Sequence, residues 1–332
     1  MTELKAVGIL GLGASLPEEI YENDHFVTKG LETTDEWIQS RTGIEKRRIA
    51  NPDQPVSSFA IEAAKTAIAK ADIPLSEIGL LVLATSSPDY CGFPSTACVV
   101  HDALGLSETC AAFDLSAACT GFNYALNTAM AYIQSGQAKY ALVIGADCLS
   151  QLTDFSDRST CVIFADGAGA AVVGELESGY GILYSKLYAK GAHTDILKVV
   201  MDDKTNFSGE AQVGPTIKME GRAVYKVAVD AIMTSIESCL KETALDPSEI
   251  DYLILHQANL RIIHAVRDRL NLSEDKVIET IRQYGNNSAA SIPIAFSDLC
   301  HASKLKKGDT ILTLGFGAGF TWAIQLIKWQ GE

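Results

Sequence analysis

Short, unbroken runs of apolar residues recur along the chain and predict strands that are buried on both faces. Four of them are LLVLA at 80–84, ALVIGA at 141–146, YLIL at 252–255 and ILTLGF at 311–316. Runs of this length without polar alternation are typical of strands covered on both sides. We therefore expect an α/β fold whose central strands are sandwiched between helices.

The same pattern occurs twice, which predicts an internal duplication. An amphipathic stretch with helical spacing precedes each copy, at 57–71 and at 227–242. Ser76 in PLSEI and Ser248 in DPSEI are 172 residues apart, and the same offset relates the segments SAACTGF and SAASIPI. Similarity at a near-constant offset is the signature of a repeated structural unit.

We place the boundary between the two predicted units after residue 175. The N-terminal half then spans residues 1–175 and the C-terminal half spans residues 176–332. Each is expected to run helix, buried strand, loop, strand, helix, strand. A polar, glycine-bearing stretch at 202–216 predicts an irregular surface loop or flap.

Positions at which the halves differ indicate where chemistry lies, because shared structure needs similar residues in both copies. Three side chains have a different residue type at the matched position: Cys119 (opposite Ser291), His256 (opposite Ala84) and Asn286 (opposite Asp114). All three fall in predicted loops beside strand ends. In open α/β sheets, the carboxyl ends of the strands line the ligand crevice.

Cys119 is predicted to be a nucleophile. It follows the predicted strand AAFDL at 111–115 and precedes the helical stretch that begins with Thr120. A thiol at a helix N-terminus has its thiolate stabilised by free N–H groups, so we expect its pKa to be lowered. A buried structural cysteine is the alternative, but the small neighbouring residues and the strand-to-helix turn favour reactivity.

His256 and Asn286 are less specific when each is taken alone. A histidine after an apolar strand is commonly a packing residue, although Ala84 in the other half indicates that packing does not demand an imidazole here. Asn286 in YGNNSAAS suits a helix cap or an Asx turn. Together with Cys119 they form a Cys-His-Asn set suited to nucleophilic catalysis.

Two glycine-rich stretches have different interpretations. GLGASL at 11–16 has Leu16 where a dinucleotide fingerprint needs its third glycine, so we discount that function. GFGAGF at 315–320 follows a predicted strand, and its backbone N–H groups could form an oxyanion hole. A tight return turn is the alternative for this second stretch.

Composition narrows the functional classes. The 332 residues are 47% hydrophobic and 20% charged, which is typical of a globular protein. Lys and Arg total 27 against 41 Asp and Glu, so the net charge of −14 argues against nucleic-acid binding. An acidic partner would need a local basic patch.

The cysteines and the apolar runs indicate the cellular compartment in which the protein is expected. The eight cysteines include no Cys-x-x-Cys pair, so neither a disulfide scaffold nor a zinc ribbon is expected. No apolar run approaches the roughly 20 residues of a membrane span, and the N-terminus lacks the pattern of a signal peptide. We expect a cytoplasmic protein with reduced thiols and no membrane association.

Taken in order along the chain, the motifs resemble one enzyme family. SAACTGF around Cys119, HQANLR from His256, YGNNSAAS around Asn286, GFGAGFTW at 315–322 and DEWIQSRTGI at 35–44 are similar to β-ketoacyl-acyl-carrier-protein synthase III. The resemblance implies a thiolase-like α/β fold, internally duplicated, with five αβαβα layers. It also implies an acyltransferase that starts type II fatty-acid biosynthesis and needs neither cofactor nor metal.

The resemblance implies roles for the catalytic residues. Cys119 would take the acyl group from an acyl-CoA primer, and the backbone N–H groups of Cys119 and Ala318 would hold the oxyanion. Malonyl-acyl-carrier protein would then lose carbon dioxide, and His256 and Asn286 would stabilise the resulting enolate. The implied partners are acyl-CoA, malonyl-acyl-carrier protein and a second copy of the chain in a homodimer.

Binding residues follow from the same resemblance. Trp37 and Arg158 are expected to sandwich the adenine of CoA, with Arg41 near its phosphates and Asn259 on the pantetheine arm. Phe93 is expected in the acyl pocket or at the dimer contact. Ordinary structural roles are the alternatives, such as a helix anchor for Trp37 and a surface ion pair for Arg158.

A basic helix face is expected to dock the acidic carrier protein. The segment RIIHAVRDRL places Arg261, Arg267 and Arg269 at helical spacing. Asp268 interrupts the adjacent basic pair that the family carries here, which leaves the strength of docking open. A solvated helix face is the alternative.

Two other functions remain open. Relatives with the same fold and the same three residues act in quinolone or polyketide pathways. A cysteine hydrolase shares the order Cys, His, Asn, but its C-G-S-C-W context is missing from this chain.

Overall fold

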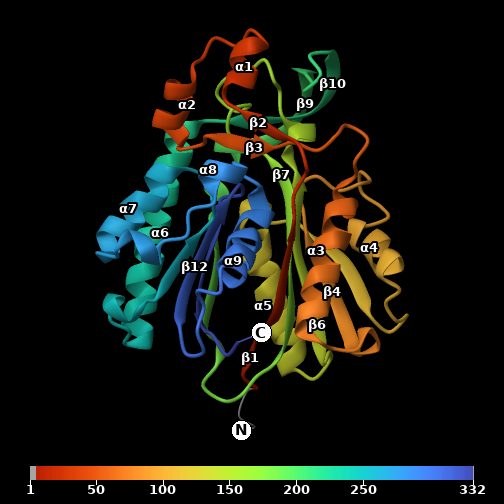
Figure 1. Ribbon diagram of the computed structural model, residues 1–332, viewed down its shortest axis with the longest axis vertical. Coiled ribbons are helices and arrows are strands. Elements are labelled where there is room, and N and C mark those ends of the chain that lie inside the picture. The colour runs from red at the N-terminus through yellow and green to blue at the C-terminus, as the bar shows by residue number, and fades with distance from the viewer. Residues whose placement is uncertain (1–4, 332) are drawn as a thin grey trace.

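Two sheets, each built from one half of the chain, form the framework of the computed structural model, which describes residues 5–331 (Figure 1). The first sheet has the strand order β1 (Val7–Ser15), β7 (Asp166–Glu175), β6 (Tyr140–Cys148), β4 (Ile78–Ala84) and β5 (Ala111–Leu115). The second has the order β11 (Tyr252–Leu255), β12 (Thr310–Gly317), β13 (Thr321–Lys328) and β8 (Gly181–Ala189). The predicted duplication is therefore confirmed.

The pairing pattern repeats between the sheets. In the first, β6 runs parallel to β4 and antiparallel to β7. In the second, β12 runs parallel to β11 and antiparallel to β13. A parallel bridge between Leu253 and Val277 stands where the second sheet would have a counterpart of β5.

Helices form three layers around and between the sheets (Figure 1). The middle layer contains α5 (Gly121–Gln134) and α9 (Ser291–His301). One outer layer contains α3 (Val56–Ala71) and α4 (Thr96–Leu104). The other outer layer contains α6 (Gly221–Thr243) and α7 (Leu260–Leu270). This is the five-layered αβαβα arrangement implied by the family resemblance. Within residues 5–331, no helix has the length and apolar character needed to cross a membrane.

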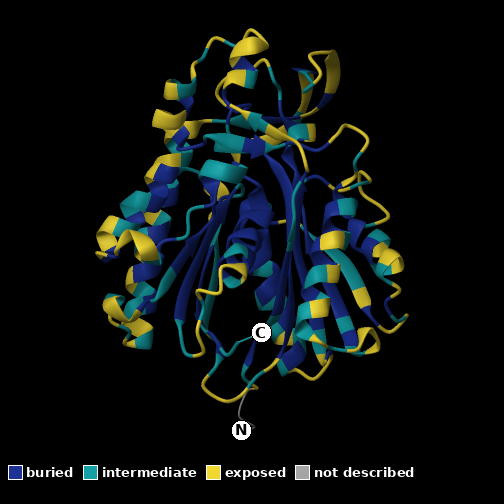
Figure 2. Cartoon of the chain, in the orientation of Figure 1, coloured by how far each residue is buried: buried dark blue, intermediate teal, exposed yellow. Residues whose placement is uncertain are grey.

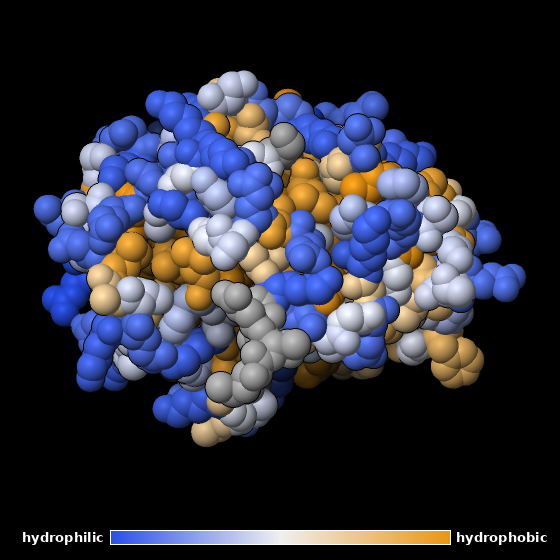
Figure 3. Space-filling model, turned by 90° about the horizontal axis from the view of Figure 1, so that it is seen from below, coloured by the Kyte–Doolittle hydropathy of each residue, from blue (hydrophilic) through white to orange (hydrophobic). Residues whose placement is uncertain are grey.

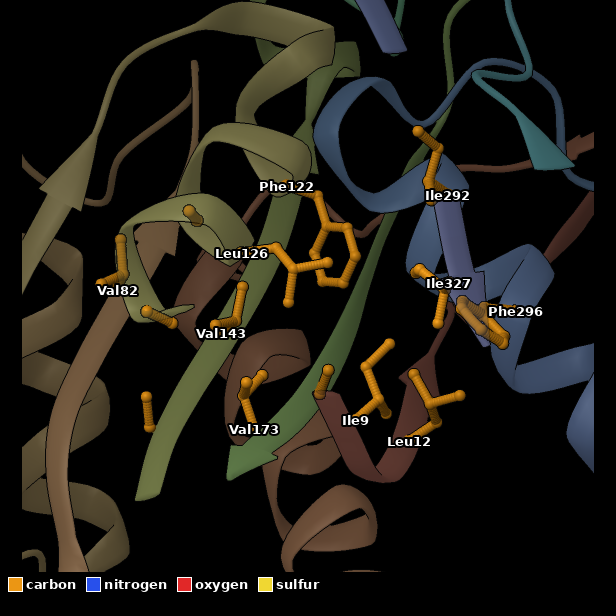
Figure 4. Packing of buried hydrophobic residues seen from close by; sticks show 14 of the residues in the cluster. Ile9, Leu12, Val82, Phe122, Leu126, Val143, Val173, Ile292, Phe296 and Ile327 are labelled. Atoms are coloured by element: carbon orange, nitrogen blue, oxygen red, sulfur yellow. The ribbon is translucent and has the colours of Figure 1, made fainter. Parts of the chain in front are cut away.

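The strands and the middle helices make up the core (Figure 2). Phe122 and Leu126 of α5 lie beside Val143 of β6, whereas Phe296 of α9 lies beside Ile327 of β13 (Figure 4). The middle layer therefore buries apolar side chains against both sheets. Continuous apolar strands are required here because each sheet is covered on both faces.

The glycine-rich stretch at 11–16 belongs almost entirely to β1. A Cβ atom at Gly13 would lie 2.2 Å from the backbone oxygen of Ala63 in α3. Glycine is needed at this point because the strand backbone approaches the helix backbone so closely. The stretch is a packing contact, in agreement with the discounted dinucleotide site.

Smaller elements cover the end of the molecule to which the parallel strands point (Figure 1). They are α1 (Asp24–Thr28), α2 (Asp35–Thr42), α8 (Ile281–Tyr284), the pair β2 (Ile20–Glu22) and β3 (Lys46–Arg48), and the hairpin β9 (Leu197–Thr205) and β10 (Ala211–Met219). At the opposite end, hydrophilic side chains surround smaller hydrophobic areas (Figure 3).

The prediction of an irregular loop at 202–216 is wrong. Most of this stretch lies in the two antiparallel strands β9 and β10, and only 206–210 forms the turn between them. Gly214 and Pro215 lie within β10. Both residue types are depleted in strands, so this segment does not have the residue pattern typical of a strand.

The repeat does not keep one offset throughout. The single helical turns before α5 and α9 begin with Ala118 (φ 47°) and Ser288 (φ 51°), which are 170 residues apart rather than 172. The matched positions at these turns are therefore corrected to Cys119 with Ala289 and Asn286 with Ser116.

Candidate active site

The structure brings Cys119, His256 and Asn286 to one cavity of about 1070 Å³. Cys119 lies in the turn before α5, His256 follows β11, and Asn286 lies in the turn before α9. The fold alone makes them neighbours, because they are far apart in the sequence. Phe316 and Gly317 at the end of β12 line the same cavity.

A buried polar network holds Cys119. Its thiol interacts with the hydroxyl of Ser288, which also interacts with the carboxyl group of Asp147. Asp147, near the end of β6, is completely buried and accepts the backbone N–H of Ala289 at 3.2 Å. The nucleophile turn and the α9 turn are thus tied together beneath the cavity.

The expectation that the pKa of Cys119 is lowered is wrong. Burial raises the pKa of its thiol to about 12, and the nearby Asp147 carboxylate adds to the rise, while the Ser288 hydroxyl acts in the opposite direction. A helix N-terminus stabilises a thiolate, but the loss of solvation that a buried thiolate suffers is the larger effect here. The resting group is therefore the neutral thiol.

His256 is fixed by its backbone and by its ring. Its N–H donates to the carbonyl oxygen of Leu314 at 2.8 Å, which extends the pairing of β11 with β12. Its Nδ1 lies 2.7 Å from Oγ of Ser291. Burial lowers the pKa of the imidazole to about 3, so the ring is neutral at physiological pH.

Both the backbone N–H group and the backbone carbonyl group of Asn286 form hydrogen bonds that hold this residue in place. Its N–H donates to the carbonyl of Ile163 at 3.0 Å, and its carbonyl accepts from the N–H of Ala165 at 2.9 Å. Its Oδ1 accepts the N–H of Ser288 at 2.9 Å. With the amide oxygen engaged, the –NH₂ group is the part that a ligand in the cavity can use.

The end of β12 touches the nucleophile turn. A Cβ atom at Gly317 would lie 2.7 Å from the backbone nitrogen of Cys119. Glycine therefore allows β12 to approach this nitrogen, as the oxyanion-hole interpretation requires. Ala318 is the next residue, and its carbonyl oxygen accepts a hydrogen bond from Thr321 at 3.2 Å.

Trp37 and Arg158 both line the cavity, and they lie against each other. The Cζ atom of Arg158 is 4.7 Å from the centroid of the Trp37 ring. The guanidinium also donates to the backbone carbonyl of Glu32. An adenine between the two side chains needs about 7 Å, twice the contact distance of stacked carbon atoms. The sandwich is therefore closed in this structure.

Asn259 and Arg41 join two segments at the rim of the cavity. Asn259 caps α7 by accepting the N–H of Arg261 at 2.9 Å, and its Nδ2 donates to the carbonyl of Arg41 at 2.9 Å. Both residues line the cavity. The amide of Asn259 thus has a structural role in addition to any contact with a ligand.

The three arginines of α7 do not form one patch. Arg261 lines the cavity. Arg267 pairs with Asp268 at 2.8 Å and with Glu274 at 3.3 Å, and Arg269 pairs with Glu237 at 3.2 Å. Of the three, only Arg261 is directed to the candidate site.

Phe93 lies outside the cavity, with 90% of its surface exposed. Its segment is connected to β5 through Asp114, whose carboxylate accepts the N–H groups of Thr96 and Ala97 at 2.8 and 2.7 Å. β5 is an edge strand of its sheet. Phe93 is therefore not part of the cavity that holds Cys119.

Several cavity residues were not predicted from the sequence. They are Arg222 and Tyr225 at the start of α6 and Phe316 on β12. Ser288 and Ser291, which contact Cys119 and His256 without lining the cavity, were not predicted either. Arg222 lies close to Met219 and Gly221, which also line the cavity. The serines act across segments distant in sequence, which no local pattern reveals.

The cavity is basic, although the chain carries a net charge of −14. Four arginines line it: Arg41, Arg158, Arg222 and Arg261. No Asp or Glu is among its lining residues, all of which belong to the described part of the chain. Such a site favours an anionic ligand.

Metal ligands do not cluster in the region that the structure describes. Among residues 5–331, no group of three His, Cys, Asp or Glu side chains is arranged to hold a metal ion.

Comparisons with known proteins find similarity along most of the chain. The family described as 3-oxoacyl-[acyl-carrier-protein] synthase III matches residues 113–191, and its C-terminal counterpart matches residues 240–329. Beta-ketoacyl-[acyl-carrier-protein] synthase III of Caldanaerobacter subterraneus is 46% identical, covering 99% of this chain and 100% of the relative.

Two solved structures extend the likeness. The synthase III of Aquifex aeolicus has a TM-score of 0.88 at 42% identity, covering 97% of this chain and all of the other. The priming β-ketosynthase of the R1128 polyketide pathway has a TM-score of 0.90 at 30% identity, covering 100% and 98%. The chain belongs to the β-ketoacyl-acyl-carrier-protein synthase III family.

Proposed function

We propose that the protein condenses an acyl-CoA primer with malonyl-acyl-carrier protein and so starts type II fatty-acid biosynthesis. One observation carries the proposal: a thiol, a neutral imidazole and an amide meet in a cavity whose charged lining residues are all arginines. The thiol suits covalent transfer of an acyl group. The arginines suit the phosphates of CoA and of a phosphopantetheine arm.

In the first half-reaction Cys119 is the nucleophile. Its sulfur attacks the thioester carbonyl of the primer, the carbon–sulfur bond to CoA breaks, and the thiol proton ends on the departing CoA. The backbone N–H groups of Cys119 and Ala318 hold the oxyanion. The close approach of Gly317 to the nitrogen of Cys119 supports this assignment.

In the second half-reaction malonyl-acyl-carrier protein loses carbon dioxide. The electron pair of the broken carbon–carbon bond moves into an enolate, whose oxygen accepts hydrogen bonds from His256 and Asn286. The enolate carbon attacks acyl-Cys119, the bond to sulfur breaks to release a 3-oxoacyl-carrier protein, and a proton from solvent restores the Cys119 thiol. The pKa of about 3 supports a neutral donor at His256, and the engaged Oδ1 of Asn286 leaves its –NH₂ as the second donor.

CoA occupies the rim of the cavity in this proposal. Its adenine lies between Trp37 and Arg158, its phosphates lie near Arg41, and its pantetheine arm passes Asn259. Because Arg158 now lies on the Trp37 ring, adenine binding requires the guanidinium to move outward by a few ångströms. Acyl-CoA is a substrate, and we propose no resident cofactor.

The carrier protein docks beside the cavity mouth at Arg261. Arg267 and Arg269 add positive charge farther along α7, but their acidic partners reduce it. The net charge of −14 makes a local basic site necessary for an acidic partner.

We also propose a homodimer and a cytoplasmic location. The exposed Phe93 and the unpaired edge of β5 lie close together and offer an interface. None of the eight cysteines, each within the described residues, is in a disulfide, which fits a reducing compartment. The nucleophile comes from the half 1–175, and both enolate donors come from the half 176–332.

A second candidate is a priming enzyme of a secondary-metabolite pathway. The 30% identity to the R1128 polyketide ketosynthase supports it, and the same three residues would serve there. A cysteine hydrolase is the least supported alternative.

The test is a condensation assay with malonyl-acyl-carrier protein and a panel of acyl-CoA primers. We expect a 3-oxoacyl-carrier protein with at least one short or medium primer. Cys119→Ala should abolish product, and His256→Ala should allow acylation of the enzyme but block decarboxylation. Failure with all primers would refute the fatty-acid role, and hydrolysis without condensation would favour a hydrolase.

A further inference from the structure

The imidazole of His256 is held through Nδ1, which lies 2.7 Å from Oγ of Ser291. Ser291 is the first residue of α9, and both side chains are only 1% exposed. The ring of Phe316 packs edge-on against the imidazole, with centroids 5.1 Å apart. Since His256 also lines the cavity, Nε2 is the nitrogen that faces a bound substrate.

The hydroxyl of Ser291 has two hydrogen-bond partners, the imidazole of His256 and the backbone N–H of Gln257. The N–H of Gln257 points to Oγ of Ser291 at 3.3 Å, so the serine oxygen is an acceptor there. The side chain of Gln257 fixes the position of this N–H group. The amide nitrogen of that side chain donates to the carbonyls of Leu255 and Ile278 at 2.8 and 3.0 Å. Among the described residues, Nδ1 of His256 is the only partner of this buried hydroxyl that can accept its proton, so the proton is directed to Nδ1.

A ring nitrogen that accepts a hydrogen bond carries no proton, so the neutral ring must carry its proton on Nε2. We propose that Ser291 is a positioning residue that holds His256 in the Nε2–H tautomer, with the donor directed at the enolate oxygen. This inference rests on the proposed condensation. The opposite tautomer would present a lone pair to the enolate and repel it.

A hydroxyl suits this position better than a carboxylate would. A carboxylate beside Nδ1 would favour the charged imidazolium, whereas a neutral hydroxyl lets burial keep the ring neutral. The other titratable groups that line the cavity are the Cys119 thiol, the Tyr225 phenol and the four arginines. The contacts described for Nδ1 involve only the neutral hydroxyl of Ser291.

The tautomer can be measured on the free enzyme. Nitrogen-15 NMR of histidine-labelled protein distinguishes a protonated ring nitrogen from a bare one, and comparison with His256→Ala assigns the signals among the six histidines. We expect Nε2–H in the wild type and loss of this preference in Ser291→Ala. Ser291→Thr, which keeps the hydroxyl, should restore it.

Kinetics provide the second readout. In Ser291→Ala, decarboxylation of malonyl-acyl-carrier protein should fall by about 10- to 100-fold, as is usual when the partner that orients an active histidine is removed. Acylation of Cys119 should change less than about twofold. The matched control is Ser297→Ala, a buried serine farther along α9 whose hydroxyl lies 3.5 Å from Nδ1 of His301, and both steps should be unaffected.

The outcomes separate this inference from the proposed function. If Ser291→Ala keeps the Nε2–H tautomer, or slows acylation as much as decarboxylation, Ser291 does not have this role. If the wild type has the predicted tautomer but makes no condensation product, the proposed function fails and the assignment of the tautomer stands. Thermal unfolding of each variant shows whether the fold is retained.

Discussion

Burial sets the protonation of the two titratable groups that meet in the cavity. It raises the pKa of the Cys119 thiol to about 12 and lowers the pKa of the His256 imidazole to about 3. Both groups are therefore neutral near pH 7. A neutral pair fits a site in which negative charge appears only transiently, on sulfur and then on an enolate oxygen. Hydrogen-bond donors stabilise each of these transient charges.

The raised pKa of Cys119 predicts how its reactivity depends on pH. Below a pKa of about 12 the thiolate fraction rises tenfold per pH unit, so alkylation by iodoacetamide should do the same from about pH 6 to pH 9. Peptide mass spectrometry measures the rate at Cys119, with the exposed Cys91 and Cys98 as internal references. A plateau for Cys119 that begins near neutral pH would contradict this prediction.

The lowered pKa of His256 predicts a loss of stability in acid. The unfolded chain takes up a proton near pH 6.5, whereas the folded protein takes it up only near pH 3, so stability falls as pH drops through this window. On going from pH 7.5 to pH 5, His256 alone lowers the free energy of unfolding by roughly 2 kcal/mol. Urea unfolding measures the fall in the free energy of unfolding between these two pH values. In His256→Asn this fall should be smaller than in the wild type by roughly 2 kcal/mol. Equal acid sensitivity in both proteins would show that His256 is not buried as a neutral group.

Contacts between elements decide the shape of the site. The end of β12 reaches the nucleophile turn only because Gly317 has no Cβ atom, and α9 delivers Ser291 and the turn with Asn286 to the same place. The strands and helices themselves follow from apolar runs and helical spacing, which is why β4, β6, β11 and β12 could be predicted. The hairpin β9–β10 could not, since its arms mix polar residues with Gly214 and Pro215.

Gly317→Ala tests the contact between β12 and the nucleophile turn. The added methyl group would lie 2.7 Å from the nitrogen of Cys119, so the N–H group must shift away from the oxyanion position. We expect acylation of Cys119 to slow by at least about 100-fold, the usual loss when one oxyanion donor is removed. The matched control is Gly191→Ala, where a Cβ atom meets nothing within 4 Å. Equal activity in both variants would exclude the proposed oxyanion site.

Charge is distributed over the whole molecule in a way that composition alone does not reveal. The net charge of −14 excludes a generally basic surface, yet the charged side chains that line the cavity are all arginines.

The sequence predicted the Cys-His-Asn set because the two halves differ there. It did not predict Arg222, Ser288 or Ser291, because their roles depend on contacts between distant segments. It also gave the wrong direction for the pKa of Cys119, since burial is a property of the folded chain.

Reversing one cavity charge tests the electrostatic part of the proposed function. Arg222→Glu should weaken CoA binding by at least about tenfold and reduce its dependence on salt, because a favourable charge becomes repulsive. Titration calorimetry at two salt concentrations measures both effects. Arg269→Glu is the control, since Arg269 is exposed, pairs with Glu237 and lies outside the cavity. Equal weakening by both substitutions would mean that net charge, and not the cavity, governs binding.

The most direct test of the whole account is the mass of the Cys119 peptide after exposure to mixed acyl-CoAs, followed by a chase with malonyl-acyl-carrier protein. We predict that Cys119 gains the mass of one acyl group, and that the chase removes it as 3-oxoacyl-carrier protein appears in equal amount. An acyl group on another residue, or one that leaves Cys119 only as free acid, would contradict the assignment of this protein as a condensing enzyme that works through Cys119.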